Sequence, residues 1–196
     1  MSSTLQGQTI VQLAQIDAKA QAAAASSTIG RDVEGNEVDC LLYLAVNGKD
    51  VFAQFWAIFV LGRARPYSKK IVPILLRIVH KTLPAAAVPR QDFPADQPRD
   101  NASRVLEGVI DVISGLEDAS NNLELLVDLY NHPILLLPTR QKAGSAIARI
   151  LSDKGNAVTL NSFMLLEMLL RDGIHDTVIA DVAECLAARS DRTEIR

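Results

Sequence analysis

Leucine-rich stretches with helical periodicity recur along this chain, and each is followed after a break by a second stretch that carries small residues. The leucine-rich stretches begin at Cys40, Leu125 and Leu165, and the stretches that follow them begin at Phe55, Ala143 and Val182. A single helical hairpin cannot bury its own apolar face, whereas a stack of hairpins can. The pattern therefore predicts an all-α fold, a right-handed α-solenoid of about four helical hairpins.

Residues that begin or end helices divide this pattern into separate elements. We expect Gly48, in a left-handed conformation, to end one helix and the Asp50 carboxylate to cap the next. Pro73 falls near the start of the following helix, where it removes one backbone donor and bends the helix without ending it. We expect Asn36 or Asp39 to open the first of these helices, which ends at residue 47, and Asn121 or Asn122 to cap the helix that ends near residue 131. The other expected helices cover residues 51–63, 69–83, 102–116, 138–152, 160–171 and 177–189.

The predicted helices make one repeat domain over residues 1–196, with the repeats themselves over 37–189. Residues 84–101 contain four prolines and no periodicity, and they predict a long loop inserted between two helices. When this loop is subtracted, the hairpins recur at intervals of about 30 to 40 residues, the spacing that is usual for helical repeats.

Both ends of a solenoid need cover, because each end repeat has one unpartnered face. Residues 1–27 predict an N-terminal capping helix with a single apolar stripe. The stripe consists of Ile10, Leu13, Ile16 and Ala20. The last hairpin, residues 160–189, lacks an evident polar capping face, so we expect a second copy of the chain or further repeats beyond the C-terminus to cover it.

Several of these helices resemble repeats of the armadillo and HEAT type. The sequence FWAIFVLG at residues 55–62 looks like the last helix of an armadillo repeat, and IVPILL at residues 71–76 looks like the first helix of a HEAT repeat. Residues 165–173 and 178–187 are similar to the two long helices of an armadillo unit. The resemblance spans residues 37–189 and implies an armadillo/HEAT-like α-solenoid that binds proteins.

One feature of the armadillo family is missing. Armadillo proteins of the nuclear-import type clamp an extended peptide backbone with asparagine side chains on the groove helix. The matching positions in this chain hold Val60 and Arg149. The resemblance therefore implies a partner that presents a folded surface or a docked helix, and not an extended peptide.

Charge is distributed unevenly along a chain whose net charge is only −3. All 23 acidic residues lie outside residues 51–91, and this acid-free stretch is rich in Lys and Arg. Such a stretch marks either a solvated helix flank with acidic neighbours in the fold, which is the commoner case, or a site for an acidic or phosphorylated protein partner. The candidate partner-binding residues are Arg63, Arg65, Lys69, Lys70, Arg77 and Lys81.

No motif for catalysis or metal binding is found in the sequence. It has no glycine-rich phosphate loop, no nucleophile elbow and no Cys-x-x-Cys pair. His132 and Asp128 alone are too few ligands for a metal, and Asp176 fits a helix N-cap. We expect a non-enzyme without catalytic residues, metal or cofactor. An all-α enzyme would need a deep pocket that combines His80 or His175 with a carboxylate.

A nucleic-acid-associated helical domain is the main alternative to a protein scaffold. It would use the basic segment 63–90, and aromatic rings nearby would stack on bases. Stacking needs exposed rings, whereas Trp56 and Phe59 fit an apolar helix face and predict core packing. The acidic balance of the whole chain also disfavours a nucleic-acid binder. We therefore expect a non-catalytic protein–protein interaction scaffold or adaptor.

The two cysteines, Cys40 and Cys185, predict buried free thiols in a reducing compartment, because small secreted domains usually carry a denser set. Residues 1–8 have neither a basic region nor an apolar core, so we expect no signal peptide. The apolar run 51–61 is too short to span a bilayer. These features predict an intracellular protein of the cytoplasm or nucleus, with no membrane partner.

Overall fold

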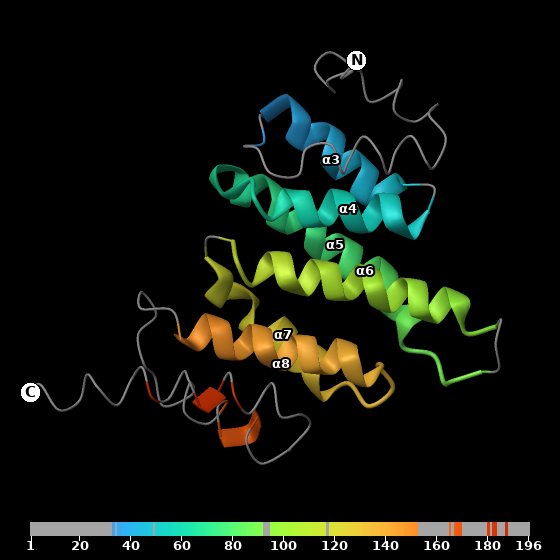
Figure 1. The fold of residues 1–196 in the computed structure, drawn as a ribbon, viewed down its shortest axis with the longest axis vertical. Helices are drawn as coiled ribbons and strands as arrows, with labels where there is room; N and C mark the ends of the chain where they lie inside the picture. The colour runs from blue at the N-terminus through green and yellow to red at the C-terminus, as the bar shows by residue number, and fades with distance from the viewer. Residues whose placement is uncertain are drawn as a thin grey trace, which may run out of the picture. The chain divides into compact units, whose positions relative to one another are not determined.

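The fold is helical throughout the part of the chain that is described. The computed structural model describes residues 33, 35–48, 50–91, 95–116, 118–152, 165, 167–169, 180, 182–183 and 187. All regular structure in these residues is helix (Figure 1), which confirms the predicted all-α class. The chain divides into two compact units, Met1–Glu117 and Asp118–Arg196. Among the described helices, none combines the length and the apolar character needed to cross a membrane.

Some predicted elements lie outside the described residues. They include the N-terminal capping helix in residues 1–27, most of the last hairpin over 160–189, and Cys185. The described residues of that hairpin are helical, and Leu169 and Val182 among them are buried.

The first unit begins with a hairpin of α3 (Gly35–Asn47) and α4 (Val51–Leu61), which pack against each other. Asp50 caps α4, as the sequence predicts. Its Oδ1 accepts hydrogen bonds from the backbone N–H groups of Phe52 at 2.7 Å and Ala53 at 2.9 Å. These bonds satisfy two of the N–H groups that the start of a helix leaves without intrahelical acceptors.

Steric crowding explains why a glycine, Gly48, follows α3. Its φ lies outside the left-handed region, so the left-handed helix end predicted from the sequence is wrong. A Cβ atom built on Gly48 would lie 2.7 Å from the carbonyl oxygen of Leu44 and 2.8 Å from Cγ of Gln54. Leu44 belongs to α3 and Gln54 to α4, so the two helices approach too closely at this corner to leave room for a side chain.

Two prolines lie inside the next long helix. A short 3-10 helix, η1 (Arg65–Tyr67), separates α4 from α5 (Ser68–Ala86). The helix continues through Pro73, as predicted, but it also continues through Pro84, where the sequence predicts the start of a loop. Both prolines are exposed on the same side of α5, so water can reach the carbonyl groups that they leave without an N–H partner.

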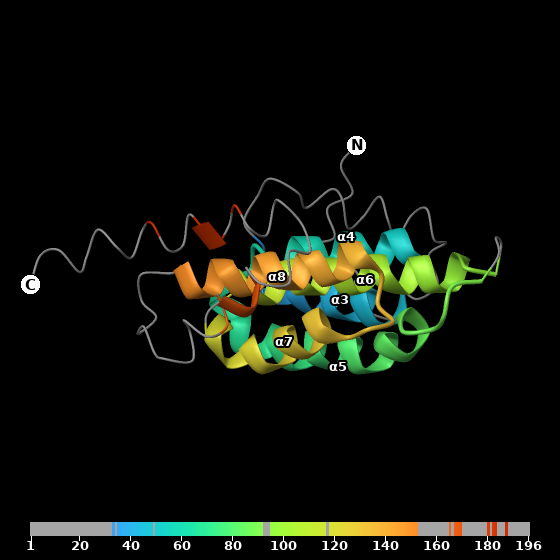
Figure 2. The ribbon, with the colours of Figure 1, turned by 90° about the horizontal axis from the view of Figure 1, so that it is seen from below.

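The last helix of the first unit among the described residues is α6 (Gln97–Ile113), which packs against both α4 and α5. Figure 2 shows α4 and α6 on one side of the unit and α5 on the other, and α3 contacts both α4 and α5. The fully buried side chains of α6 fill the space between these helices. They are Leu106, Val109, Ile110 and Ile113, each with 0% exposure.

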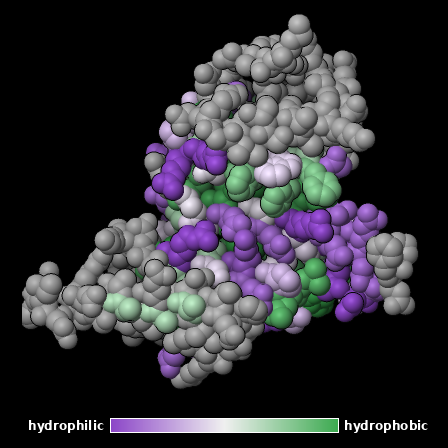
Figure 3. Space-filling view, in the orientation of Figure 1, coloured by the Kyte–Doolittle hydropathy of each residue, from purple (hydrophilic) through white to green (hydrophobic). Residues whose placement is uncertain are grey.

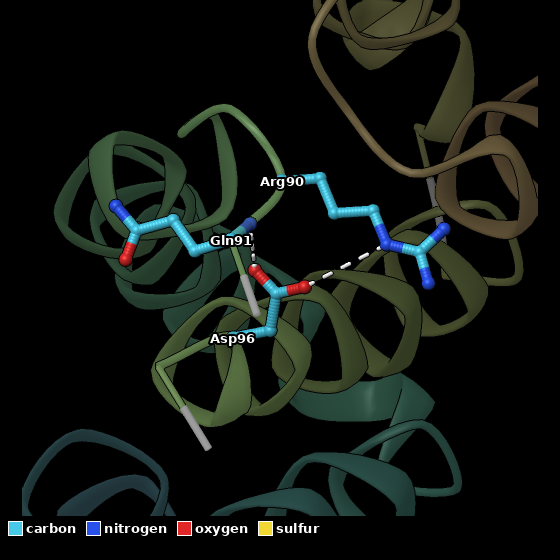
Figure 4. A network of polar contacts seen from close by, with 3 residues as sticks. All are labelled: Arg90, Gln91 and Asp96. Atoms are coloured by element: carbon cyan, nitrogen blue, oxygen red, sulfur yellow. Dashed lines mark hydrogen bonds and ion pairs between the residues drawn. The ribbon is translucent and has the colours of Figure 1, made fainter. Parts of the chain in front are cut away.

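The connection between α5 and α6 is shorter than the loop predicted over residues 84–101, because helix covers both ends of that range. Pro98 lies in the first turn of α6. Backbone N–H groups in the first turn have no acceptor within the helix, so a proline there costs no hydrogen bond. The Asp96 carboxylate accepts a hydrogen bond from the backbone N–H of Gln91 at 2.7 Å and lies 3.8 Å from Nε of Arg90 (Figure 4). These contacts tie the connection to the start of α6.

The second unit contains a 3-10 helix, η2 (Ala119–Asn122), followed by α7 (Leu123–Asn131) and α8 (Leu137–Ser152). Asp118 precedes η2 with a φ of 58°, in the left-handed region that Asp adopts more readily than most residues. Asn122 stands at the N-cap position of α7, but its side chain makes no capping bond.

In the second unit, α7 and α8 pack against each other, and α7 contributes a buried tyrosine. Tyr130 of α7 has no exposed surface, and its backbone carbonyl accepts a hydrogen bond from Nε of Arg140 at 2.8 Å. Because Arg140 belongs to α8, this bond joins the end of one helix to the start of the next. The helix that was predicted to end near residue 131 and the one predicted over residues 138–152 therefore form a hairpin.

The cap of α4 leads to a first prediction. Asp50→Ala removes both capping bonds, so we expect the free energy of unfolding to fall by about 0.5–2 kcal/mol. Urea denaturation followed by the fluorescence of Trp56 would measure this loss, since Trp56 is the one tryptophan of the chain and lies on α4. Asp50→Ser keeps a capping oxygen and is expected to retain most of the stability. Equal losses in the two variants would contradict the capping role.

Candidate functional site

The exposed side of α5 is basic along its length and carries no acidic residue. Its solvent-facing residues are Lys69, Lys70, Pro73, Arg77, His80, Lys81, Pro84 and Ala85. The opposite side of the helix is apolar and buried, with Ile71, Leu75, Ile78 and Val79 in the core. Lys69, Arg77 and Lys81 are spaced over twelve residues, or about 18 Å of helix. We call Lys69, Lys70, Arg77 and Lys81 the basic face of α5.

One member of the basic face is neutralised by a neighbour in the fold. Nζ of Lys70 lies 2.6 Å from Oδ1 of Asp39 on α3, and both side chains are about half exposed. A pair with this exposure stabilises the fold by at most about 1 kcal/mol. Lys69, Arg77 and Lys81 make no ion pair or hydrogen bond in the described structure. An acidic neighbour in the fold, as expected for a solvated helix flank, is therefore present for Lys70 but not for Lys69, Arg77 or Lys81.

The structure separates the remaining basic candidates from this face. Arg65 is exposed in η1, before α5 begins. Arg63 follows the end of α4, and its guanidinium carbon lies 6.0 Å from the centre of the Phe59 ring. Arg63 therefore belongs to the surface of α4. Arg90, the last basic residue of the acid-free stretch, is held by Asp96 in the connection after α5.

The outward side of α4 carries four aromatic residues at helical spacing, which we call the aromatic stripe of α4. Phe52 is 57% exposed and Phe59 is 41% exposed, while Phe55 and Trp56 are half-buried. The rings meet edge to face, with centroids 5.8 Å apart for Phe55 and Trp56 and 5.7 Å apart for Trp56 and Phe59. The core packing predicted for Phe59 is wrong, and that predicted for Trp56 holds only in part.

The reason for this outcome is that the core position of α4 is taken by its aliphatic side. That side is formed by Ala53, Ala57, Ile58, Val60 and Leu61, all buried. The two alanines let α4 approach its neighbours closely, and the three larger aliphatic residues fill the core beside them. At Gly108 of α6, a Cβ atom would lie only 3.2 Å from the ring of Phe55. The alternation of small and aromatic residues around α4 is the sequence signal that could have revealed the exposed stripe.

An apolar groove of about 310 Å³ lies beside the aromatic stripe, and we call it the aromatic groove. Its α4 wall consists of Val51, Phe52, Phe55 and Trp56. Arg104 and Glu107 of α6 form its other wall. Figure 3 shows apolar side chains at the surface over α4, next to hydrophilic residues over α6.

A second cavity of about 370 Å³ lies where α3, α4, α5 and α6 meet, with a more polar lining. The Asp50 carboxylate at its edge is already engaged in capping α4, and Lys81 connects the cavity with the basic face of α5. No histidine lines either this cavity or the aromatic groove. His80 is exposed on α5, and His175 lies outside the described residues.

Within the described residues, no three of His, Cys, Asp and Glu are grouped so that they could hold a metal ion. Cys40 is buried on α3, as the sequence predicts. Burial raises the pKa of its thiol, and the neighbouring charges of Asp39 and Glu37 raise it further. The thiol is therefore protonated at neutral pH and is a poor nucleophile and metal ligand.

The positions of other residues singled out in the sequence are also clear. Val60, which stands where armadillo proteins of the nuclear-import type have an asparagine, is fully buried in α4. Arg149 is exposed on α8, in the other unit. His132 lies half-buried at the end of α7, and Asp128 is exposed one turn before it. The Val60 position therefore faces the core and does not line a groove.

No family model, curated protein or solved structure matches the chain. Function is therefore inferred from the two surfaces of the first unit, the basic face of α5 and the aromatic stripe of α4.

Proposed function

We propose that the chain is a non-catalytic protein-interaction scaffold, and that the basic face of α5 binds an acidic or phosphorylated segment of a protein partner. The observation that carries this proposal is the row of unpaired cations on α5. Lys69, Arg77 and Lys81 are exposed along about 18 Å of one helix, α5 itself carries no acidic residue, and Asp39 of α3 pairs with Lys70 alone.

The packing of α5 favours such a role. Its apolar side is buried against the core, so the helix holds its exposed cations on a rigid support. Hydrogen bonds between Lys or Arg and a carboxylate or phosphate are stronger than neutral ones. A row of like charges also attracts an oppositely charged partner before contact, an effect that salt screens.

We further propose that the hairpins continue as a right-handed α-solenoid of the armadillo/HEAT type. Support comes from the pairing of α3 with α4 and α5 with α6, together with the contact between α4 and α6. In a solenoid, the second helices of successive hairpins lie side by side in this way. Stacked helices would present an extended rigid surface, which suits a scaffold that recognises a folded surface or a docked helix.

Nucleic acid is a weaker candidate for the partner, although the exposed rings of Phe52 and Phe59 could stack on bases. Binding of a single strand combines stacking rings with cations that follow the backbone. In the first unit the rings lie on α4 and the row of cations lies on α5, and these helices are on opposite sides (Figure 2). One strand could not use both surfaces along a continuous path.

Charge reversal tests the proposal. We expect the variant Lys69→Glu/Arg77→Glu to weaken binding of a fluorescein-labelled oligoglutamate peptide, and of its phosphoserine counterpart, by about tenfold or more. Fluorescence anisotropy with the full chain would measure both affinities at low and at physiological ionic strength. Circular dichroism is expected to show an unchanged fold, because both side chains are exposed.

A matched control separates this site from a general effect of charge. Arg104→Glu/Arg149→Glu changes the net charge equally at exposed positions away from α5 and is expected to leave the peptide affinity nearly unchanged. Equal weakening in both double variants would exclude the basic face as the site. If an RNA oligomer of the same charge bound more tightly than the peptides, nucleic acid would be the better assignment for the partner of this face.

A further inference from the structure

The cavity of about 370 Å³ where α3, α4, α5 and α6 meet has an apolar floor and a polar rim, and we call it the rimmed cavity. Its floor consists of four buried residues, Ala45, Ile78, Ala102 and Val105. Its rim carries polar side chains that are exposed or half-buried, among them Asp50 and Lys81. Binding pockets combine an apolar interior with a few polar groups and usually measure about 300–1,000 Å³. The rimmed cavity has this composition, and its volume is at the small end of that range.

The basic face of α5 leads into the rimmed cavity. Arg77, Lys81 and Ala85 follow one another at intervals of four residues, so they lie along one side of the helix, about one turn apart. All three are exposed, and Lys81 and Ala85 line the cavity. Lys81 therefore belongs to both surfaces, and a partner that lies along the basic face reaches the mouth of the cavity.

The charges and the floor of the rimmed cavity determine which side chain can enter it. An acidic side chain inside would meet the like charge of the Asp50 carboxylate at the rim, and it would lose water of hydration against the apolar floor. A neutral apolar side chain meets neither penalty and removes the floor from water. The cavity therefore suits an apolar side chain, whereas acidic side chains suit the row of cations outside it.

We propose that the partner segment bound by the basic face carries a bulky apolar residue next to its acidic residues, and that this residue enters the rimmed cavity as an anchor. The inference rests on the proposed function, because it names a further feature of the segment that the basic face binds. Attraction between exposed charges draws in many acidic chains alike. An anchor in a cavity selects among them, because a few buried residues supply most of the affinity at protein interfaces.

The dimensions of the two surfaces set the length of a suitable test peptide. The basic face from Lys69 to Lys81 extends over about 18 Å, and the step from Lys81 to Ala85 adds about 6 Å. An extended chain covers this total with about seven residues. A peptide of eight glutamates with one further residue at each end is therefore long enough to reach the cavity from the basic face in either orientation.

Two peptides that differ only in their end residues test the proposal. One carries leucine at both ends of the eight glutamates and the other carries alanine, and each competes unlabelled with the fluorescein-labelled oligoglutamate peptide for the full chain. The leucine peptide is expected to bind about tenfold more tightly, because leucine buries more apolar surface than alanine. Fluorescence anisotropy would measure both affinities.

The outcomes separate this inference from the proposed function. If the alanine peptide binds and the leucine peptide binds no more tightly, the anchor is wrong and the proposed function stands. If neither peptide competes and the labelled peptide itself does not bind, the proposed function is wrong and the anchor with it.

A variant that closes the rimmed cavity locates the leucine. Ala85→Trp places a large side chain at the mouth, so it is expected to remove the tenfold advantage of the leucine peptide and to leave the alanine peptide unaffected. Ala180→Trp is the control, because Ala180 is exposed, helical and absent from the lining, and the advantage is expected to persist. An advantage that survives Ala85→Trp would show that leucine binds outside the cavity and would overturn the proposal.

Discussion

Leu106→Ala is expected to lower the free energy of unfolding of the first unit by about 2–5 kcal/mol. Leu106 has no exposed surface and lies on α6, the helix that packs against both α4 and α5. The truncation removes buried methyl groups from the core, and the close-packed surroundings of such a site relax only in part to fill the space. Because whole domains are stable by about 5–15 kcal/mol, this loss is a large part of the total.

The same truncation at a half-buried position is the control for this prediction. Leu76→Ala on α5 removes the same atoms from a side chain that is only partly buried, so a clearly smaller loss is expected. Urea denaturation followed by Trp56 fluorescence would compare the two variants in the same unit. Equal losses would contradict the complete burial of Leu106 in the core.

Gly48→Ala is expected to destabilise the first unit by about 1–3 kcal/mol. The added Cβ atom would lie 2.7 Å from the carbonyl oxygen of Leu44 and 3.2 Å from the backbone nitrogen of Gln54. Backbone atoms cannot turn aside as a flexible side chain can, so the corner between α3 and α4 has to open. Urea denaturation of the full chain would measure the loss.

Gly115 provides a glycine without this constraint. A Cβ atom there would have its nearest neighbours at 3.7 and 3.8 Å, which is ordinary van der Waals contact. Gly115→Ala is therefore expected to change the free energy of unfolding by no more than about 0.5 kcal/mol. If Gly48→Ala and Gly115→Ala lowered the free energy of unfolding equally, the loss at Gly48 would come from backbone conformation and not from crowding.

A helix start could be predicted from the sequence where the capping group bonds to residues close to it in the chain. The Asp50 cap was predicted because its bonds reach only two and three residues along the chain. Pro84 and Pro98 were assigned to a loop because prolines usually end helices. Their effect depends on where they fall, and the last turn of α5 and the first turn of α6 both tolerate them.

The candidate site was predicted in part. The basic face of α5 was found because the absence of acid and the helical spacing are both properties of the sequence. The aromatic stripe was missed because α4 is apolar on every side, so periodicity cannot tell which side faces the core. The crowding at Gly48 was missed for a similar reason, since it arises where one helix meets another.

The order of residues alone was sufficient to predict an all-helical chain, most of its hairpins and a basic segment of α5. Only the folded structure decided which cations stay unpaired, because the partner of Lys70 is Asp39 on another helix. It also decided that α4 buries its alanines and branched aliphatic residues and exposes Phe52 and Phe59. Burial and ion pairing depend on contacts between residues far apart in the chain, and local patterns do not contain those contacts.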